Sequence, residues 1–103
     1  MPPGPVTTPP SRAGNWPWTS QRQITEYDLQ GLSLRDLELM RNEIYARHGW
    51  VFRRQDLRRY FESQPWYRPN QDGLANRMVE AGLSGVERRN VQIIQEQERR
   101  IRR

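Results

Sequence analysis

The chain has 103 residues, a formal net charge of +5 at pH 7 and no cysteine. Its length leaves room for one small domain. The lack of cysteine excludes disulfides, thiol nucleophiles and thiolate metal sites, and a single histidine is too few for an ordinary zinc site. We therefore expect neither a metal nor a cofactor. No apolar run is long enough for a transmembrane helix or for the core of a signal peptide.

The N-terminal residues differ in composition from the rest of the chain. Residues 1–14, MPPGPVTTPPSRAG, hold five of the eight prolines and almost no large apolar side chain, which is typical of an extended, disordered tether. We predict this Pro-rich tether over residues 1–14 and a folded domain over residues 15–103. Trp16 and Trp18 come next, and we expect residues 15–23 to cross the domain surface with at least one tryptophan packed against it.

Helical signals begin with the stretch TEYDLQG. Thr25 can cap a short helix that ends at Gly31. The clearest helix opens at Ser33, with Asp36 three residues later in what is close to a capping box. Gly49 ends this helix, because glycine adopts the left-handed conformation without steric cost.

The second half of the chain contains further helical segments with clear breaks between them. Residues 53–63 present apolar side chains on one side, and two prolines and an Asp-Gly pair interrupt the chain over residues 64–73. Residues 74–82 are ambiguous. Ser84 and Glu87 form a second capping box that opens a long C-terminal helix. No segment alternates with period two, so we predict an all-α fold, a small bundle of about four short helices.

Two predicted helices carry polar residues in the middle of their apolar faces. On a helical wheel, the apolar arc of residues 33–49 contains Arg41 and His48. Asn90 interrupts the stripe of the last helix, with Glu87 on its flank. A buried guanidinium needs acceptors for most of its donors, so we predict a structural polar network of these four residues in which Arg41 bonds to Glu87 or Asn90. The apolar residues of that last stripe are Leu83, Val86, Ile93, Ile94 and Ile101.

The end of the central helix carries three polar residues whose roles have to be considered separately: Glu43, Arg47 and His48. Glu43 and Arg47 project outside the apolar arc, so we expect an exposed i,i+4 ion pair worth a few tenths of a kcal/mol. For His48 two interpretations remain open. As a structural residue it would donate to a backbone carbonyl near the helix end. As a general base or ligand it would need a cleft and a partner acid, and the sequence shows no such pairing.

Aromatic residues gather in the middle third of the chain: Trp50, Phe52, Tyr60, Phe61, Trp66 and Tyr67. The simpler interpretation is that they fill the core between short helices. The alternative is that Trp66 and Tyr67, which lie in a loop bounded by prolines, form a stacking platform for a sugar or a peptide. Together with the outward-facing Arg47, these two residues are the candidate ligand contacts.

The stretch RNEIYARHG, residues 41–49, followed by FRRQDLRRYFESQPWYRPN and VERRNVQII, resembles the YARHG domain family. The motif itself is intact from Tyr45 to Gly49, and the resemblance runs from about Ser20 to about Glu98. It implies a bacterial protein located outside the cytoplasm, in the periplasm or at the cell surface. It also implies an accessory module that accompanies peptidases, kinases or anchoring segments, in a family without a characterised molecular function.

These features predict a non-catalytic, monomeric binding module whose partner is an envelope component or another protein. The competing prediction is an Arg-rich nucleic-acid-binding module, favoured by the isoelectric point of about 10.7 and the terminal sequence RRIRR. Against it, most arginines are interleaved with carboxylates and do not form one patch. A third interpretation, an enzyme that uses His48 with Glu43 or Tyr45, lacks an acid–base pairing, so we expect no catalytic residue.

Overall fold

The computed structural model describes residues 14–70 and 75–102, so the predicted tether lies almost entirely outside the described residues. No strand occurs in this described part, and the all-α prediction is confirmed. None of its helices is long and apolar enough to cross a membrane. One 3₁₀ turn and five α-helices follow in chain order: η2 (Pro17–Ser20), α1 (Glu26–Leu29), α2 (Leu34–Arg47), α3 (Gln55–Glu62), α4 (Ala75–Gly82) and α5 (Gly85–Arg102).

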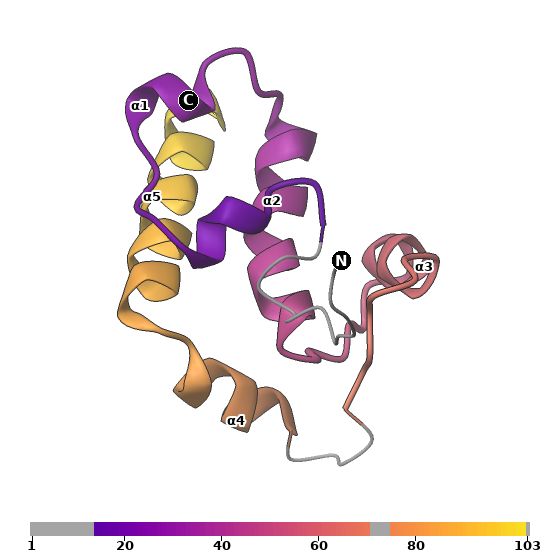
Figure 1. The fold of residues 1–103 in the computed structure, drawn as a ribbon. Coiled ribbons are helices and arrows are strands. Elements are labelled where there is room, and N and C mark those ends of the chain that lie inside the picture. Colours follow the sequence, from indigo (N-terminus) through magenta and orange to yellow (C-terminus); the bar gives the residue numbers. More distant parts are fainter. Residues whose placement is uncertain (1–13, 71–74, 103) are drawn as a thin grey trace, which may run out of the picture.

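The two longest helices, α2 and α5, lie side by side and run antiparallel (Figure 1). Their facing sides form the main core, where the side chains of Leu37, Met40, Ile44 and Ile94 are fully buried. Each such side chain stabilises the fold by about 1.5–3 kcal/mol. The predicted apolar arc of α2 therefore does face the core.

The buried face of α5 is rotated from the predicted stripe. Val91 and Ile94 lie at its centre, whereas Val86 and Ile101 are exposed at 37% and 42%. Val86 falls at the edge of the buried arc and Ile101 in the last turn of the helix. The helical wheel correctly predicts that α5 has an apolar face, but it misplaces the centre of that face. It includes Val86, which lies at the edge of the buried arc, and omits the buried Val91.

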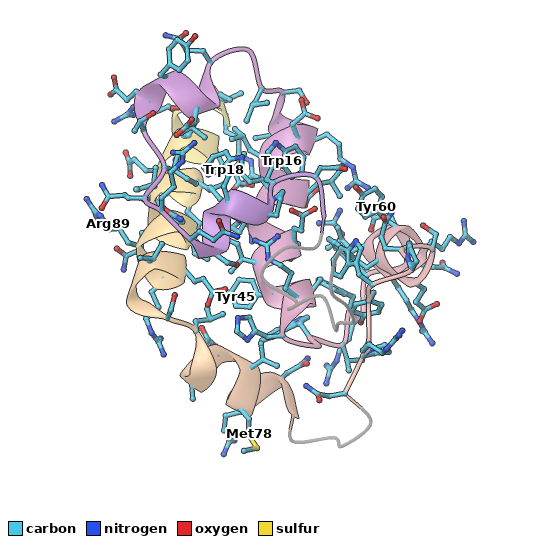
Figure 2. All side chains as sticks on the ribbon, viewed as in Figure 1. Trp16, Trp18, Tyr45, Tyr60, Met78 and Arg89 are labelled. Atoms are coloured by element: carbon cyan, nitrogen blue, oxygen red, sulfur yellow. The ribbon has the colours of Figure 1, made fainter. Side chains whose placement is uncertain are left out.

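The N-terminal segment, residues 14–24, crosses the α2–α5 pair with η2 at its middle (Figure 1). Trp16 and Trp18 pack against the main core as partly buried side chains (Figure 2), which confirms that this stretch covers the domain. Ile24 and Leu29 are buried in the same core. The segment and α1 thus complete a core that two helices alone would leave open.

Helix α3 packs on a second, aromatic cluster next to the C-terminal end of α2. Phe52 and Phe61 stack with ring centroids 4.7 Å apart, and Gly49 allows the turn that brings Phe52 back, because its φ of +91° is in the left-handed region. The interpretation of the six aromatics as core residues is therefore confirmed for three of them, and the other three pack against the cluster as partly buried side chains. The buried members of the cluster are Ala46, Phe52, Leu57, Phe61 and Tyr67.

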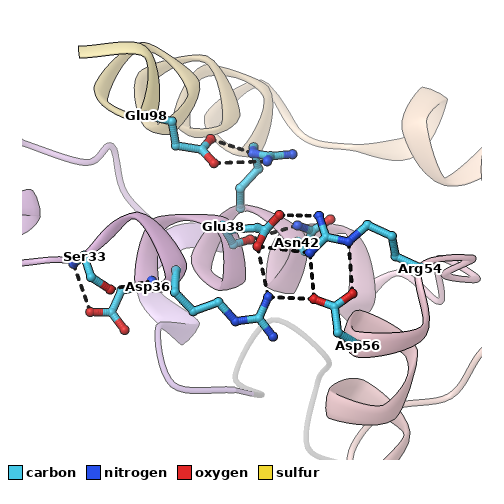
Figure 3. Close-up of polar contacts among 9 residues, drawn as sticks. Ser33, Asp36, Glu38, Asn42, Arg54, Asp56 and Glu98 are labelled. Atoms are coloured by element: carbon cyan, nitrogen blue, oxygen red, sulfur yellow. Dashed lines mark hydrogen bonds and ion pairs between the residues drawn. The ribbon is translucent and has the colours of Figure 1, made fainter. Parts of the chain in front are cut away.

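Exposed ion pairs join α3 to the first half of α2. Glu38 of α2 accepts from Arg54 at 2.5 Å, and Arg54 also pairs with Asp56 at 2.6 Å (Figure 3). Arg35 pairs with Asp56 at 2.9 Å. Exposed pairs of this kind contribute little individually, so this network orients α3 more than it stabilises the domain.

Candidate functional site

The polar side of α2 is buried beneath the N-terminal segment. Glu43 and Arg47 form an ion pair at 2.9 Å with both side chains only 1% exposed. The prediction of an exposed surface pair is therefore wrong. Both residues do project away from the apolar arc of α2, but residues 14–20 cover that side and exclude solvent from it.

Glu43 receives the backbone of the N-terminal segment. The backbone N–H groups of Asn15 and Trp16 donate to its two carboxylate oxygens at 2.7 and 2.9 Å. Successive N–H groups that converge in this way form an anion-binding nest, and here the anion is a side chain of the same protein. Gly14 has a φ of +104°, and a Cβ at this position would lie 2.1 Å from the Glu43 carboxyl carbon. Any other residue there would have to displace the Glu43 carboxylate and would be strained at this φ.

Arg47 bonds to the same carboxylate and also holds the segment directly. Besides its bond to Glu43, Arg47 donates from Nη2 to the hydroxyl of Thr19 and from Nε to the hydroxyl of Ser20 at 3.0 Å. Thr19 itself donates to the carbonyl of Trp16 at 2.7 Å. Arg47 is thus occupied inside the domain, and its prediction as a ligand contact is wrong because its guanidinium does not reach the surface.

Burial sets the electrostatics of this pair. Removal of the Glu43 carboxylate from water raises its pKa, even though the Asn15 and Trp16 N–H groups and Arg47 stabilise the charged form. Burial also lowers the pKa of Arg47, opposed by Glu43. An arginine side chain stays protonated at ordinary pH, so the charge of Arg47 remains in place and requires Glu43 as its partner.

Asn90 fixes the other end of the segment from α5. Its Oδ1 accepts from the N–H of Ile24 at 2.8 Å, and its Nδ2 donates to the carbonyls of Thr19 and Arg22 at 2.8 and 2.9 Å. The side chain is fully buried. Sequence reasoning placed Asn90 in the apolar stripe, and its partners turn out to be the backbone of the N-terminal segment.

His48 and Glu87 link the end of α2 to the start of α5. The His48 Nε2 atom lies 2.9 and 3.0 Å from the two carboxylate oxygens of Glu87, which also accept from the hydroxyl of Ser20 and the N–H of Ser84. The His48 side chain is 33% exposed, and Glu87 is nearly buried. His48 therefore bonds to a carboxylate, and the predicted bond to a backbone carbonyl is wrong.

The hydrogen bonds to Glu87 decide its charge. Burial acts to raise the pKa of this carboxyl, but bonds from His48, the Ser84 N–H and Ser20 outweigh burial and lower the pKa to about 2. Glu87 is consequently ionised across the physiological range. A fixed carboxylate at Nε2 also orients the imidazole ring.

Arg41 makes a different bond from the one predicted. It donates from Nε and Nη2 to Glu98 at 2.8 and 3.1 Å (Figure 3), and its side chain is 23% exposed. The predicted bond from Arg41 to Glu87 or Asn90 is wrong. In the antiparallel pair His48 lies opposite Glu87, so Arg41, two turns earlier on α2, lies opposite the C-terminal half of α5.

The two aromatic candidates have different environments. Tyr67 is 8% exposed and donates its hydroxyl to the carbonyl of Trp50 at 2.5 Å, so its ring belongs to the aromatic cluster and cannot stack on a ligand. Trp66 is partly buried and contacts Phe61 edge-on at 6.1 Å between centroids. Of the predicted stacking pair, only Trp66 keeps an accessible ring surface.

The geometry of this polar network is that of a structural unit. Among the described residues, no buried side-chain nitrogen or oxygen lacks a hydrogen-bond partner, and no three His, Asp or Glu side chains are placed to hold a metal ion. Ser20, a hydroxyl in contact with the His48–Glu87 pair, donates to Glu87 and not to the imidazole, so it is not positioned as a nucleophile beside a histidine base.

Five residues that bond within the network were not predicted to do so from the sequence: Asn15, Trp16, Thr19, Ser20 and Glu98. The first four lie in a segment without a helical hydrophobic period, so a helical wheel gives no information about them. The pairing of Glu98 with Arg41 depends on the register between α2 and α5, which the pattern of either helix alone does not contain.

Comparison with known proteins gives one assignment. Neither the curated proteins nor the solved structures contain a match to this chain. The model of the family described as the YARHG domain matches residues 13–99, a range that begins beside Gly14 and ends beside Glu98, the outermost residues of the network. The chain therefore belongs to the YARHG domain family.

Proposed function

We propose that this domain is a non-catalytic binding module of a bacterial envelope or secreted protein. In this proposal the residues of the YARHG motif are architectural: they fasten the N-terminal segment across α2 and α5. The surface of the domain, and not the motif, then meets the partner, which is an envelope component or another protein outside the cytoplasm.

The proposal rests on one observation: the charged side chains of the motif are bonded to other residues of the domain. Arg47 bonds to Glu43, Thr19 and Ser20, and His48 bonds to Glu87. His48 has the carboxylate partner that a general base requires, but a base also needs a reacting group beside it, and among the described residues no hydroxyl donates to its imidazole ring. The polar composition of the motif is explained without a reaction.

A sedimentation experiment tests the proposal. The full chain is incubated with isolated bacterial cell-wall sacculi and, separately, with random-sequence duplex DNA at about 100 mM salt. We expect co-sedimentation with the envelope material and no retention on DNA. Steep log–log salt dependence of DNA binding would instead support the competing nucleic-acid-binding function.

A His48→Gln variant tests whether binding requires a histidine that can act as an acid or a base. Glutamine keeps a donor that can reach Glu87 but cannot act as a base near pH 7. We expect this variant to bind the envelope material as the wild type does. Loss of binding with an intact fold, measured by far-UV circular dichroism, would contradict the purely architectural role of the motif.

A further inference from the structure

The two faces of α5 carry very different charge. Of its three carboxylates, Glu87 and Glu98 point inward, are buried, and pair with His48 and Arg41. The solvent-facing side retains Glu96 as its only carboxylate, against five exposed arginines. These arginines are Arg88, Arg89, Arg99, Arg100 and Arg102. The inward placement of two carboxylates thus leaves an excess positive charge on the outer face.

A groove of about 800 Å³ runs between α1 and this outer face of α5. Its volume falls in the range of ligand sites, roughly 300–1,000 Å³. Arg89, Arg99 and Arg100 line it from α5, and Arg89 points away from α2 on the outer side of the helix (Figure 2). Ile93, which is only partly buried, supplies apolar surface in the same groove, and the buried Leu29 lies at its lining.

The polar groups of the groove are open to a partner. Arg99 and Arg100 share one carboxylate, Glu96, at 2.6 and 3.9 Å, and among the described residues Arg89 makes only a 3.5 Å contact to Gln92. The groove therefore holds three guanidinium groups and two carboxylates, Glu96 and Glu26, and within the described part of the chain most of the guanidinium donors have no acceptor. This contrasts with Arg41 and Arg47, whose guanidinium groups are bonded within the domain.

We propose that this groove binds a peptide segment of a partner protein in which acidic side chains flank an apolar anchor. The arginines complement the carboxylates, and the partly exposed side chain of Ile93 accepts the anchor. The inference rests on the proposed function as a binding module and names the chemistry of its partner. Charged residues at the rim of such a site govern chiefly the association rate and its salt dependence.

A polyanion such as single-stranded DNA fits the groove less well. Glu26 lines the wall opposite the arginines, and a continuous phosphate backbone would pass beside this carboxylate. A peptide can instead place a neutral or basic side chain there. An apolar anchor also uses surface that a phosphate chain would leave uncovered.

The probe is a fluorescein-labelled peptide of about twelve residues composed of glutamate, aspartate and leucine, long enough to fill the groove as a helix or extended chain. Fluorescence anisotropy with the full chain is compared for three further probes. One peptide has lysine in place of every acidic residue, one has serine in place of leucine, and the third probe is an oligothymidylate of similar length. We expect binding only by the acidic, leucine-containing peptide, with an affinity that falls as salt is raised.

The protein variants localise the binding. Arg89→Glu with Arg100→Glu reverses two charges in the groove, and Arg53→Glu with Arg59→Glu makes the same change in net charge at exposed positions in and beside α3. We expect at least about tenfold weaker peptide binding for the groove variant and little change for the α3 variant. Equal loss in both variants would mean that net charge alone attracts the peptide, and would overturn the proposal.

Other outcomes separate this inference from the proposed function. Equal binding of the serine peptide, tighter binding of oligothymidylate, or no peptide binding at all would each overturn the acidic-peptide inference. If the groove variant still sediments with envelope material, the binding-module proposal stands while the groove is excluded as its site. If the wild type binds neither the peptide nor the envelope material, both proposals fail.

Discussion

Two consecutive residues at the C-terminal end of α2, Arg47 and His48, belong to acid–base pairs with opposite environments. The Glu43–Arg47 pair is dry, with both side chains 1% exposed, whereas the His48–Glu87 pair reaches solvent through a histidine that is 33% exposed. Burial raises the pKa of Glu43, while hydrogen bonds overcome burial and lower the pKa of Glu87 to about 2. The N-terminal segment covers the first pair, whereas it contacts the second pair through the hydroxyl of Ser20. The comparison shows that this difference in cover determines how each carboxylate contributes to the stability of the fold.

The dry pair should give the largest loss of stability. Arg47→Ala leaves the carboxylate of Glu43 buried without its counter-ion and removes the bonds to Thr19 and Ser20. We expect a cost of about 3–5 kcal/mol, measured as a shift in the urea midpoint. An unchanged midpoint would mean that the N-terminal segment is not held as described. Arg59→Ala, at an exposed position, is the matched control and should change stability by less than about 0.5 kcal/mol.

The solvent-linked pair should give the second largest effect, as a function of pH. Glu87 has a pKa lowered from 4.5 to about 2 in the folded state, so its stabilising contribution is present above about pH 4.5 and is lost as the pH falls toward 2. The contribution is at most about 3 kcal/mol. Urea midpoints measured from pH 6 down to pH 2 should fall less steeply in Glu87→Gln than in the wild type. Parallel profiles would contradict this assignment.

The contribution of Glu43 to stability should depend on pH in the opposite direction. Because its folded-state pKa is raised, its contribution is fully present below the ordinary pKa of glutamate and is lost as the pH rises through the folded value. The stability of Glu43→Gln relative to the wild type should therefore increase with pH through this window, whereas that of Glu87→Gln should decrease. Two profiles of the same sign would remove the distinction between the dry and the solvent-linked pair.

Loss of the pair between Arg41 and Glu98 should reduce stability by less than loss of the Glu43–Arg47 pair or of the His48–Glu87 pair. Arg41 is part-exposed and its partner is buried, so Arg41→Ala leaves Glu98 able to recruit water. We expect a cost of about 1–2 kcal/mol, between the values for exposed and buried pairs. Equilibrium urea unfolding measures it, and a cost equal to that of Arg47→Ala would mean that cover by the N-terminal segment makes no difference.

Much of the fold could be predicted because its signals are local. Ser33 with Asp36 is observed as a capping box, and Ser84 exchanges the corresponding bonds with Glu87. The inward arc of α2 follows from a period of 3.6. Asn90 was recognised because a polar residue in an apolar stripe needs a partner inside the domain.

The site could be predicted only in part, because its remaining signals are not local. Glu43 and Arg47 point away from the apolar arc, and only the position of an aperiodic segment decides that they are buried. The partner of Arg41 depends on the register between two helices, which a wheel for one helix does not contain. The same glutamate–arginine spacing on a surface without a covering segment would be an ordinary exposed pair.

Hydrogen exchange at the backbone amides of Asn15, Trp16 and Ile24 tests the central claim most directly. These N–H groups donate to Glu43 and Asn90, so if the motif fastens the N-terminal segment to the core, they should open only with the domain. We predict protection close to that of the central amides of α2 and α5, and its loss in Arg47→Ala under folding conditions. Exchange of these three amides at free-chain rates, while α2 and α5 remain protected, would contradict the account.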